Sequence, residues 1–330
     1  MLNLAGMASP NQTPTPPGGL ARREVLTVNR IGTLLAQAGF RPTNAELFFG
    51  DDAAVLGPVP EGHQVVFCTD AGVSGVHQDP KFVSLADLGW RTTMATLSDL
   101  AAMGAAPWCA VATVGAGSPS EAEEVMIGVI DAGRDIGCPV VGGDLTAAAL
   151  PFVSIAALGT VPVGSALPRS GARPGDVLVV TGPLGGSAAG LRLLREGVND
   201  VAGLGALHRR PSPRFAEGRA ARRSRAHAMI DVSDGLSIDL HRLCDASGVG
   251  FIVDTVPIHN GALRTEALSG GEDFELLIAT DDVARLSDVF LSEGLRQPIV
   301  LGEVHANPEV RKIEGVQDKP SGFVHEINER

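Results

Sequence analysis

Residues 229–240 read MIDVSDGLSIDL, and their pattern sets the fold class. The stretch opens with apolar and β-branched residues that predict a strand at 229–232, and a helical spacing follows at 236–246. The turn between them holds Asp234 and a glycine. A strand, an acidic turn and a helix in this order are typical of layered α/β domains, whose ligands usually bind where strands end.

The same alternation continues through the rest of the chain. Strands are predicted at 65–69, 139–141, 152–161, 177–181, 251–253, 274–279 and 299–304, and helices at 22–38, 85–103, 119–136, 187–195 and 283–293. Residues 197–227 carry many arginines and no clear period, so we expect an irregular segment there. Gly and Pro cluster at 170–176 and indicate a domain boundary. We therefore predict an α/β protein with α+β layers: a flexible tail at 1–20, an N-terminal sheet-plus-helices domain at 21–168 and a C-terminal α/β domain at 169–330.

Composition disfavours several classes of protein. The 330 residues include 38 acidic and 26 basic side chains, for a net charge of -12. This balance disfavours binding to nucleic acid or anionic membranes, and a phosphate ligand would need cations of its own. The four cysteines form no CxxC pair, which suggests neither a zinc site nor disulfides and favours a cytoplasmic location. The uncharged stretch 145–168 is interrupted by Pro and Gly, so a buried strand is favoured over a membrane span.

Acidic residues recur in glycine-rich turns and next to apolar stretches. They are Asp51, Asp52, Asp70, Asp99, Asp144, Asp231, Asp234, Glu272 and Asp273. Asp is a common helix cap and turn residue, so any one of them could be structural. Gathered in space, however, such carboxylates repel one another unless a divalent cation neutralises them. Oxygen ligands without a His or Cys motif select Mg²⁺, which typically bridges carboxylates and substrate phosphates.

The usual nucleotide-binding signatures are missing. The chain has neither GxxxxGK[ST] nor GxGxxG, which disfavours a P-loop enzyme and a standard dinucleotide fold. The stretch TGPLGGSAAGL (181–191) offers glycines that could cradle a phosphate at a helix start. Tight packing of a strand against a helix explains the same glycines about as well.

Several longer motifs are distinctive as a set. They are GDDAAV (50–55), TDAGVSGVH (69–77), LSDLAAMGAAP (97–107), GGDLT (142–146), ALPRSGARPGD (166–176), DVSDGLSIDL (231–240) and SGGEDFELL (269–277). In these motifs the chain resembles the thiamine-monophosphate kinase family, which has the fold of aminoimidazole ribonucleotide synthetase. The matches follow the family order and span about residues 22 to 325.

The resemblance implies an ATP- and Mg²⁺-dependent kinase that converts thiamine monophosphate to thiamine diphosphate, as a homodimer that pairs N-terminal domains. It implies metal ligation by Asp52, Cys68 (through its backbone carbonyl), Thr69, Asp70, Asp99, Asp144, Asp231 and Asp234. It implies ATP contacts from Gly143, Arg169 and Ser233, and contacts to the thiamine compound from His77, Glu272 and Phe323. No catalytic residue is expected beyond the metal ligands and Arg169, because a phosphate monoester is already ionised near neutral pH and needs no general base.

Alternatives remain open at this point. Other ATP-using enzymes of the same fold are weaker candidates, because selenophosphate synthetases use an N-terminal Cys or selenocysteine and hydrogenase-maturation relatives a C-terminal Cys, whereas the cysteines here begin at Cys68 and end at Cys244. A non-catalytic nucleotide or metal sensor is a further alternative, since Leu145 and Ala147 stand where the family usually has Thr and Arg. His77 could equally be a satisfied core or surface histidine and Arg169 a solvated linker residue. The arginines of 209–225 are expected to form a solvated loop face.

Overall fold

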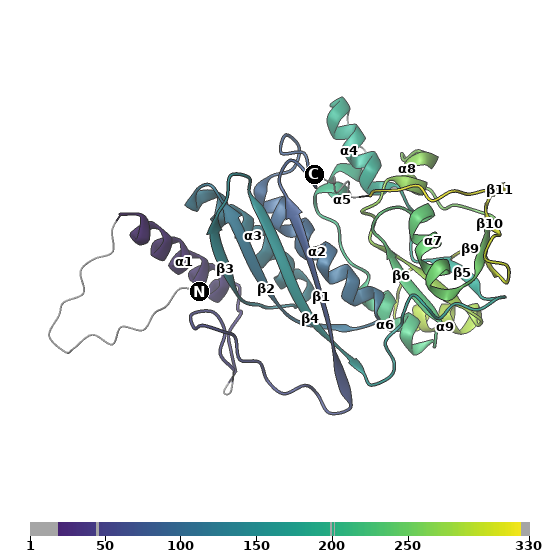
Figure 1. Ribbon diagram of the computed structural model, residues 1–330, viewed down its shortest axis with the longest axis horizontal. Coiled ribbons are helices and arrows are strands. Elements are labelled where there is room, and N and C mark those ends of the chain that lie inside the picture. The colour runs from purple at the N-terminus through teal and green to yellow at the C-terminus, as the bar shows by residue number, and fades with distance from the viewer. Residues whose placement is uncertain (1–18, 44–45, 199, 201, 325–330) are drawn as a thin grey trace, which may run out of the picture.

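The computed structural model of the protein describes residues 19–43, 46–198, 200 and 202–324. The tail expected at residues 1–20 lies outside these ranges, except for Gly19 and Leu20, which begin a helix. The described chain forms two halves, each built on its own β-sheet with helices packed against it (Figure 1). This arrangement confirms the predicted α/β class.

The N-terminal half is a four-stranded sheet with helices on one face (Figure 1). Its strand order is β1-β4-β2-β3; β2 and β3 are parallel and the other neighbours are antiparallel. Its elements are strands β1 (His63–Val73), β2 (Ala106–Ala116), β3 (Val140–Ala147) and β4 (Phe152–Pro162), and helices α1 (Gly19–Gln37), α2 (Leu85–Ala102) and α3 (Pro119–Ile136). Every second residue of β4 is buried, because one face of the sheet packs on helices and the other does not.

Short sequence signals set the ends of these helices. The Ser84 hydroxyl accepts a hydrogen bond from the Asp87 N–H at the start of α2, and Ser118 accepts from the Glu121 N–H at the start of α3. Such caps satisfy backbone N–H groups that the first turn leaves unpaired. Gly104 follows α2 with φ +68°, as expected of a left-handed helix end. The predicted helices at 85–103 and 119–136 are therefore confirmed.

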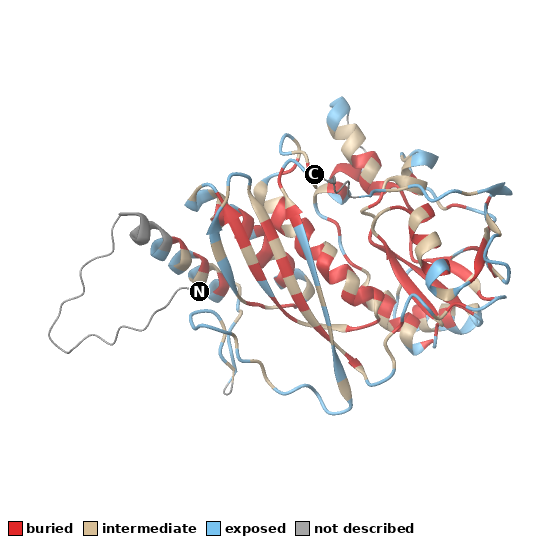
Figure 2. Ribbon diagram, in the orientation of Figure 1, coloured by how far each residue is buried: buried red, intermediate tan, exposed pale blue. Residues whose placement is uncertain are grey.

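The C-terminal half is a seven-stranded sheet in the order β11-β10-β7-β9-β5-β8-β6. Its elements are strands β5 (Val177–Val180), β6 (Ala228–Val232), β7 (Gly250–Val253), β8 (Glu275–Thr280), β9 (Ile299–His305), β10 (Arg311–Ile313) and β11 (Val316–Gln317), and helices α4 (Gly186–Glu196), α5 (Leu204–Arg209), α6 (Phe215–Arg223), α7 (Leu236–Ser247), α8 (Arg264–Ser269) and α9 (Val283–Ser292). Strands β6 and β8 are buried along their whole length. Figure 2 shows buried residues along both sheets and along α2, which runs between the halves.

The prediction that residues 197–227 are irregular is wrong. The segment contains α5 and α6, and α6 packs against α2 and α9. Phe215 joins the hydrophobic core of the N-terminal half, although it lies in the C-terminal half of the sequence. These helices have only six and nine residues and follow one another across Pro211 and Pro213, so no apolar period is long enough to predict them.

The basic segment also does not form a uniformly solvated face. Arg210 pairs with Asp87 on α2 (Nε–Oδ1 2.8 Å), and the Arg222 guanidinium donates to the carbonyl of Gly104 (3.0 Å). The Trp90 indole donates to the backbone carbonyl of residue 211 (2.9 Å). These contacts tie α5, α6 and their connection to α2, so the arginine-rich segment joins the two halves.

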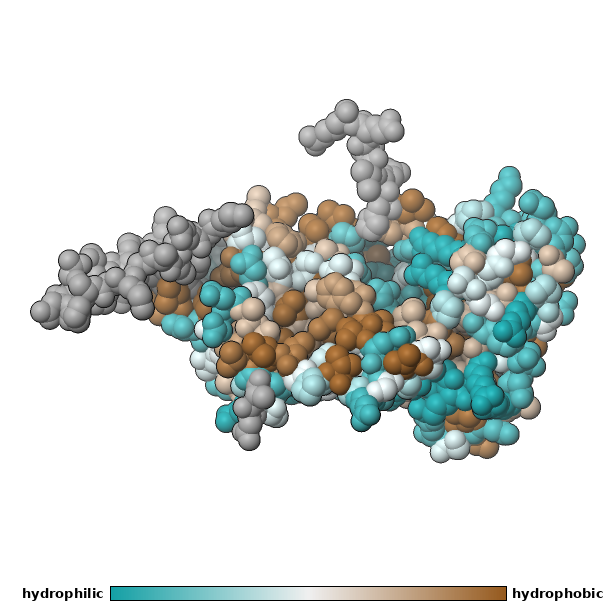
Figure 3. Space-filling view, turned by 60° about the horizontal axis from the view of Figure 1, so that its bottom comes forward, coloured by the Kyte–Doolittle hydropathy of each residue, from teal (hydrophilic) through white to brown (hydrophobic). Residues whose placement is uncertain are grey.

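One face of the first sheet remains uncovered in the single chain. Phe67 on β1 is 65% exposed and Val65 43%, and Val111 on β2 is also exposed. Figure 3 shows hydrophobic side chains gathered on one side of this half of the molecule. Strand β4 occupies the uncharged stretch at 145–168, which confirms the predicted strand. Across the described residues, no helix combines the length and the apolar character needed to cross a membrane.

Candidate active site

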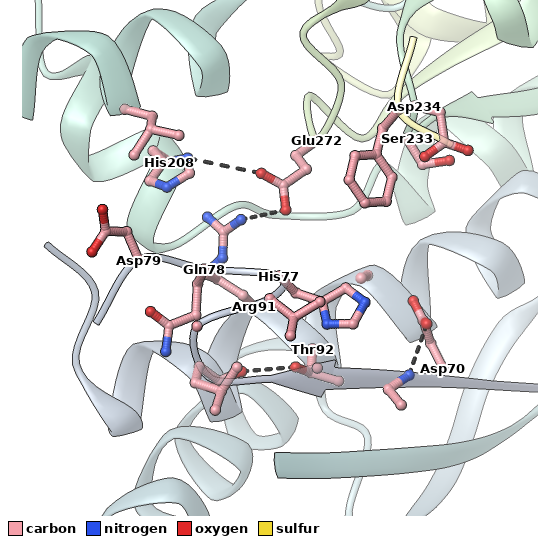
Figure 4. Close-up of a pocket in the computed structure, with 18 of the residues that line it drawn as sticks. Asp70, His77, Gln78, Asp79, Arg91, Thr92, His208, Ser233, Asp234 and Glu272 are labelled. Atoms are coloured by element: carbon pink, nitrogen blue, oxygen red, sulfur yellow. Dashed lines mark hydrogen bonds and ion pairs between the residues drawn. The ribbon is translucent and has the colours of Figure 1, made fainter. Parts of the chain in front are cut away.

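A cavity of about 690 Å³ lies between the two halves. Its walls come from β1 and the loop that follows it, from α2, and from helices and loops of the C-terminal half (Figure 4). Six of the residues singled out from the sequence line it: Asp70, His77, Ser233, Asp234, Glu272 and Phe323. The fold therefore brings together side chains that are up to 253 positions apart in the sequence.

A group of carboxylates lies at the contact between β1, α2 and β6. Burial and the negative charge of Asp70 raise the pKa of Asp99 to about 6. Burial and the charge of Asp99 likewise raise the pKa of Asp231 to about 6. Burial, followed by the charges of Asp99, Asp70 and Asp231, raises the pKa of the Cys68 thiol to about 12. These side chains are thus close enough to repel one another in a poorly hydrated site.

Few of the described side chains offset the negative charge of these carboxylates. Ser98, next to Asp99 on α2, donates a hydrogen bond of 2.6 Å to Asp231 and so links the two halves. Arg169 lies close enough to Asp99 and Asp231 to act on the pKa of both, in the opposite direction to burial. The Cys68 thiol donates to the carbonyl of Thr96 (3.1 Å). The pKa values of both aspartates remain raised, so additional positive charge nearby would stabilise their ionised forms.

The structure does not bring all predicted metal ligands to one point. Asp70, Ile155, Ala112 and Gly143 form one row across the sheet. With neighbouring strands about 4.8 Å apart, the first and last of this row are separated by about 14 Å. Asp144 therefore lies at the opposite edge of the sheet from Asp70. Among the described residues, no group of three or more His, Cys, Asp or Glu side chains is arranged to hold one metal ion.

The two faces of the sheet also separate the predicted ligands. Side chains alternate along a strand, so Thr69 and Asp144 point to the uncovered face, whereas Asp70 points to the face covered by α2. A Cβ on Gly72, which shares the face of Asp70, would lie 2.0 Å from the Thr92 hydroxyl of α2. The single acidic cluster expected from the sequence is thus divided between the two faces.

Asp52 lies apart from both groups. It is exposed in the GDDAAV segment, where its backbone N–H donates to the Asp51 carboxylate (2.9 Å). It does not line the cavity, and it does not contribute to the raised pKa of Asp99 or Asp231. The single chain therefore gives no geometric support for Asp52 as a ligand of the same ion.

The turn at residues 233–235 is held by a buried carboxylate. Asp239 Oδ2 accepts hydrogen bonds from the N–H groups of Ser233, Asp234 and Gly235, at 3.0–3.2 Å. Arg242 bridges Asp239 (2.7 Å) and Asp234, with which it also forms an ion pair. Asp239 is therefore a structural acceptor in this turn, and it presents Ser233 and Asp234 to the cavity.

Loops from the C-terminal half close around this turn. The Phe323 N–H donates to the Asp234 carbonyl (3.0 Å), and the Glu272 N–H donates to the Ser233 carbonyl (2.7 Å). Gly271 has φ +69°, and a Cβ there would lie 2.7 Å from the Ser233 carbonyl oxygen. Only glycine fits this approach. The glycine of SGGED therefore allows the loop to pack on the DVSDG turn.

Glu272 and His77 face the cavity from opposite halves (Figure 4). Glu272 has φ +58°, unusual for a residue with a side chain, and it pairs with the buried Arg91 of α2. His77 Nδ1 accepts a hydrogen bond from the Val73 N–H (3.0 Å), so its neutral ring carries the proton on Nε2.

The glycine-rich turn at 181–191 is occupied by a carboxylate of the protein itself. Asp273 accepts from the N–H of Gly185 (2.6 Å) and from that of Ser187 (3.2 Å), at the start of α4. Burial raises the pKa of Asp273 to about 6 against these hydrogen bonds. The packing interpretation of these glycines therefore fits the structure better than a phosphate cradle.

Several residues of the site carry no sequence signal of their own. Arg91 and His208 line the cavity from α2 and α5. Arg91 stands in an apolar helix face, and His208 is surrounded by arginines in the segment expected to be irregular. Their role depends on contacts between distant parts of the chain, which sequence spacing does not reveal.

Comparisons with known proteins agree with the fold. The family model of the AIR synthase related protein, N-terminal domain, matches residues 50–161, and that of the C-terminal domain matches residues 173–313. The chain is 38% identical over 260 residues to the thiamine-monophosphate kinase of Escherichia coli K12, covering 73% of this chain and 78% of that protein.

Solved structures extend these matches over more of the chain. The crystal structure of thiamine-monophosphate kinase from Stenotrophomonas maltophilia has a TM-score of 0.76 and 32% identity, covering 88% of this chain and 96% of that one. The structure of AaThiL complexed with AMPPCP and TMP has a TM-score of 0.70 and 25% identity, covering 92% and 97% of the two chains. On these matches in sequence and structure, the chain belongs to the thiamine-monophosphate kinase family, within the AIR synthase related proteins.

Proposed function

We propose that the protein transfers a phosphoryl group from ATP to thiamine monophosphate and so forms thiamine diphosphate. The observation that carries this proposal is the cavity between the halves, which is lined by Asp70, Asp234 and Glu272. Relatives named thiamine-monophosphate kinase, and a solved relative complexed with AMPPCP and TMP, support it. AMPPCP is an analogue of ATP, so that relative binds both kinds of ligand.

Magnesium is part of this proposal, and the residues present fit it. Asp99 and Asp231 have raised pKa values because they are buried near other carboxylates, and a cation would relieve this repulsion. Mg²⁺ is usually held by one or two carboxylates, waters and substrate phosphates, so it does not need a cage of three protein ligands. The separation of Asp70 from Asp144 favours several ions over one. Bound Mg²⁺ would neutralise negative charge on the phosphates.

The proposed ligands fall into two groups, on the cavity side and outside it. Asp70, Asp99, Asp231 and Asp234 would hold ions on the cavity side, and Asp144, Thr69, Asp52 and the Cys68 carbonyl would hold ions outside it. Gly143, Arg169 and Ser233 would contact ATP, and His77, Glu272 and Phe323 would contact thiamine monophosphate.

The chemistry asks mainly for positioning and charge neutralisation. The acceptor oxygen belongs to a phosphate monoester that is already ionised near neutral pH, so no side chain has to remove a proton. Phosphoryl transfer then depends on holding the two phosphates in line and on donors that stabilise the charge of the transferring group. Arg169, which lies near Asp99 and Asp231, would supply such donors from the protein itself.

Incubation of the purified protein with ATP, Mg²⁺ and thiamine monophosphate tests the function directly. We expect thiamine diphosphate and ADP in equal amounts, and no comparable turnover of other phosphate monoesters in a substrate panel. Asp234→Asn should abolish turnover with the fold intact, whereas the exposed Asp288→Asn on α9 should not. ATP consumption with a different monoester, and none with thiamine monophosphate, would replace the proposed substrate.

We also propose a homodimer that pairs N-terminal halves through the uncovered sheet face. The exposed Val65, Phe67 and Val111 give this face an apolar centre, and a contiguous exposed apolar surface usually marks an interface. Phe67→Asp should therefore shift the protein from dimer to monomer in sedimentation experiments. An unchanged mass would remove this face as the interface.

A cytoplasmic location completes the proposal. Cys68, Cys109, Cys138 and Cys244 are all free thiols, as expected in a reducing compartment. Localisation of a tagged full-length chain in its host would test this assignment.

A further inference from the structure

Three buried polar atoms beside the cavity lack a hydrogen-bond partner within the described residues. They are Arg91 Nη1, His208 Nε2 and Gln78 Oε1, and all three residues line the cavity. The side chains of Arg91 and His208 are only 6% and 3% exposed. Buried donors and acceptors without partners are rare in proteins and unfavourable, so their gathering at one cavity points to a ligand that pairs with them.

These atoms surround one carboxylate that joins the two halves. Arg91 Nη2 forms an ion pair with Glu272 Oε1, and His208 Nδ1 lies 3.9 Å from Glu272 Oε2 (Figure 4). His208 Nδ1 is also 3.1 Å from the hydroxyl of Ser187 on α4. The ion pair holds Glu272 in place and leaves Arg91 Nη1 as a second donor beside it.

The protonation of His208 follows from its surroundings. Burial, followed by the charges of Arg91, Arg195 and Arg209, lowers the pKa of His208 to about 3, so the ring is neutral. Its Nδ1 faces a carboxylate and a hydroxyl, and this favours the tautomer that carries the proton on Nδ1. Nε2 is then an acceptor, as are Gln78 Oε1 and the Glu272 carboxylate. Among the three unpaired atoms and the Glu272 carboxylate, Arg91 Nη1 is therefore the donor and the others are acceptors.

We propose that Arg91, His208 and Glu272 recognise the aminopyrimidine ring of the substrate, with Arg91 also positioning Glu272. This inference rests on the proposed function. The ring carries an amino group, which donates two hydrogen bonds, next to a ring nitrogen, which accepts one. The amino group meets Glu272 and His208 Nε2, and the ring nitrogen meets Arg91 Nη1. Arg91 and His208 are thereby specificity-determining residues at the opposite end of the substrate from the reacting phosphate.

An oxo analogue of thiamine monophosphate, with a carbonyl in place of the ring amino group, tests this pattern. The analogue reverses each group: its oxygen accepts where the amino group donated, and its ring nitrogen donates where it had accepted. A site with fixed buried donors and acceptors rejects such an exchange strongly. We expect wild-type protein to prefer thiamine monophosphate over the analogue by about 100-fold or more in kcat/KM.

A pair of substitutions at His208 separates recognition from folding. His208→Asn keeps a polar atom near Ser187 but has no atom at the Nε2 position, so it should raise the KM for thiamine monophosphate about tenfold with little change in kcat. It should also reduce the preference over the oxo analogue by about tenfold. His208→Gln carries its amide to the Nε2 position and should restore the KM to within about threefold of wild type.

The controls decide between the possible outcomes. His241→Asn changes another largely buried histidine, which contacts Asp318 and Arg311 away from the cavity, and should leave KM and preference unchanged. Equal use of both substrates by wild type, or an unchanged KM and preference in His208→Asn, would overturn this inference while the kinase function stands. If wild-type protein forms no thiamine diphosphate at all, the proposed function fails, and this inference fails with it.

Discussion

Asp99→Asn gives a quantitative test of the carboxylate group. Burial and the charge of Asp70 raise the pKa of Asp99 from 3.8 to about 6. A difference of about two pH units corresponds to about 3 kcal/mol, which the ionised carboxylate costs the folded protein at pH 7.5 when no cation is bound. Asn has nearly the same size and no charge. We therefore expect the metal-free variant to be more stable than wild type by about 1–3 kcal/mol, the upper value being the full relief of this cost.

The pH dependence of this difference has a defined sign. The Asp99 carboxyl takes up its proton near pH 6 in the folded protein and near pH 4 in the unfolded chain. As the pH falls through 6, wild type becomes protonated in the folded state and its disadvantage shrinks. Below about pH 4 both states are protonated and the difference disappears. Urea unfolding of both proteins in chelator at pH 7.5, 6 and 4.5 measures the predicted convergence.

Added Mg²⁺ and AMPPCP should reverse the order of stability, so that wild type becomes more stable than Asp99→Asn. Wild type gains stability from a ligand that binds only its folded state, whereas the variant has lost a proposed ligand atom and gains less. Asp288→Asn, on the exposed surface of α9, serves as the control and should follow wild type throughout. If Asp99→Asn were less stable than wild type at pH 7.5 without metal, the ionised Asp99 carboxylate would stabilise the folded protein. The destabilisation of Asp99 by burial and by Asp70 would then be wrong.

Two further substitutions test contacts that hold the C-terminal half together. Arg214 binds the buried Glu275 carboxylate through Nε (3.0 Å) and Nη2 (2.7 Å). Arg214→Met removes this partner and should lower the free energy of unfolding by about 3–5 kcal/mol, as measured by urea unfolding. A decrease below about 1 kcal/mol would mean that Glu275 does not depend on this ion pair. Gly271→Ala should cost about 2 kcal/mol more than Gly294→Ala. Both glycines have φ +69°, but only a Cβ at 271 meets other atoms, of which the Ser233 carbonyl oxygen is the nearest. Equal costs would show that the two loops do not pack as closely as described.

Regular elements with a clear period could be predicted from the sequence, and the residues between them could not. Strand β4 and helix α3 follow from alternation and from the Ser118 cap. Helices α5 and α6 are short, and they are stabilised by contacts with α2, such as the pair of Arg210 with Asp87. Local helix propensity does not depend on such tertiary contacts, so the sequence wrongly predicted an irregular structure for the arginine-rich segment.

The sequence motifs also predicted only part of the candidate site. The motifs marked Asp70, Ser233 and Glu272 as candidate site residues, and the fold brings all three to one cavity. Asp70 lies within strand β1, whereas Ser233 and Glu272 lie in loops. The motifs did not show that Asp144 faces the other side of the sheet. The face that a strand residue occupies depends on which side the helices cover, and GGDLT has no alternation that would indicate it.

Hydrogen-bond partners distinguish the acidic residues that sequence patterns treat alike. The carboxylates of Asp239 and Asp273 already accept several backbone N–H groups, so they have a structural role and little capacity for a cation. Asp99 accepts no such bond among the described residues and has a raised pKa, so of these carboxylates it has the most to gain from the cation proposed above.

Asp234 is an intermediate case, because the positive charge beside it comes from Arg242. An ion bound there would compete with Arg242 for the same oxygen. Arg242 would still keep Asp239 as its partner, at 2.7 Å, so the exchange would leave no charge unpaired. The proposed binding of Mg²⁺ by Asp234 is therefore compatible with a turn that is folded without metal, because Arg242 and the backbone N–H groups already balance its carboxylates.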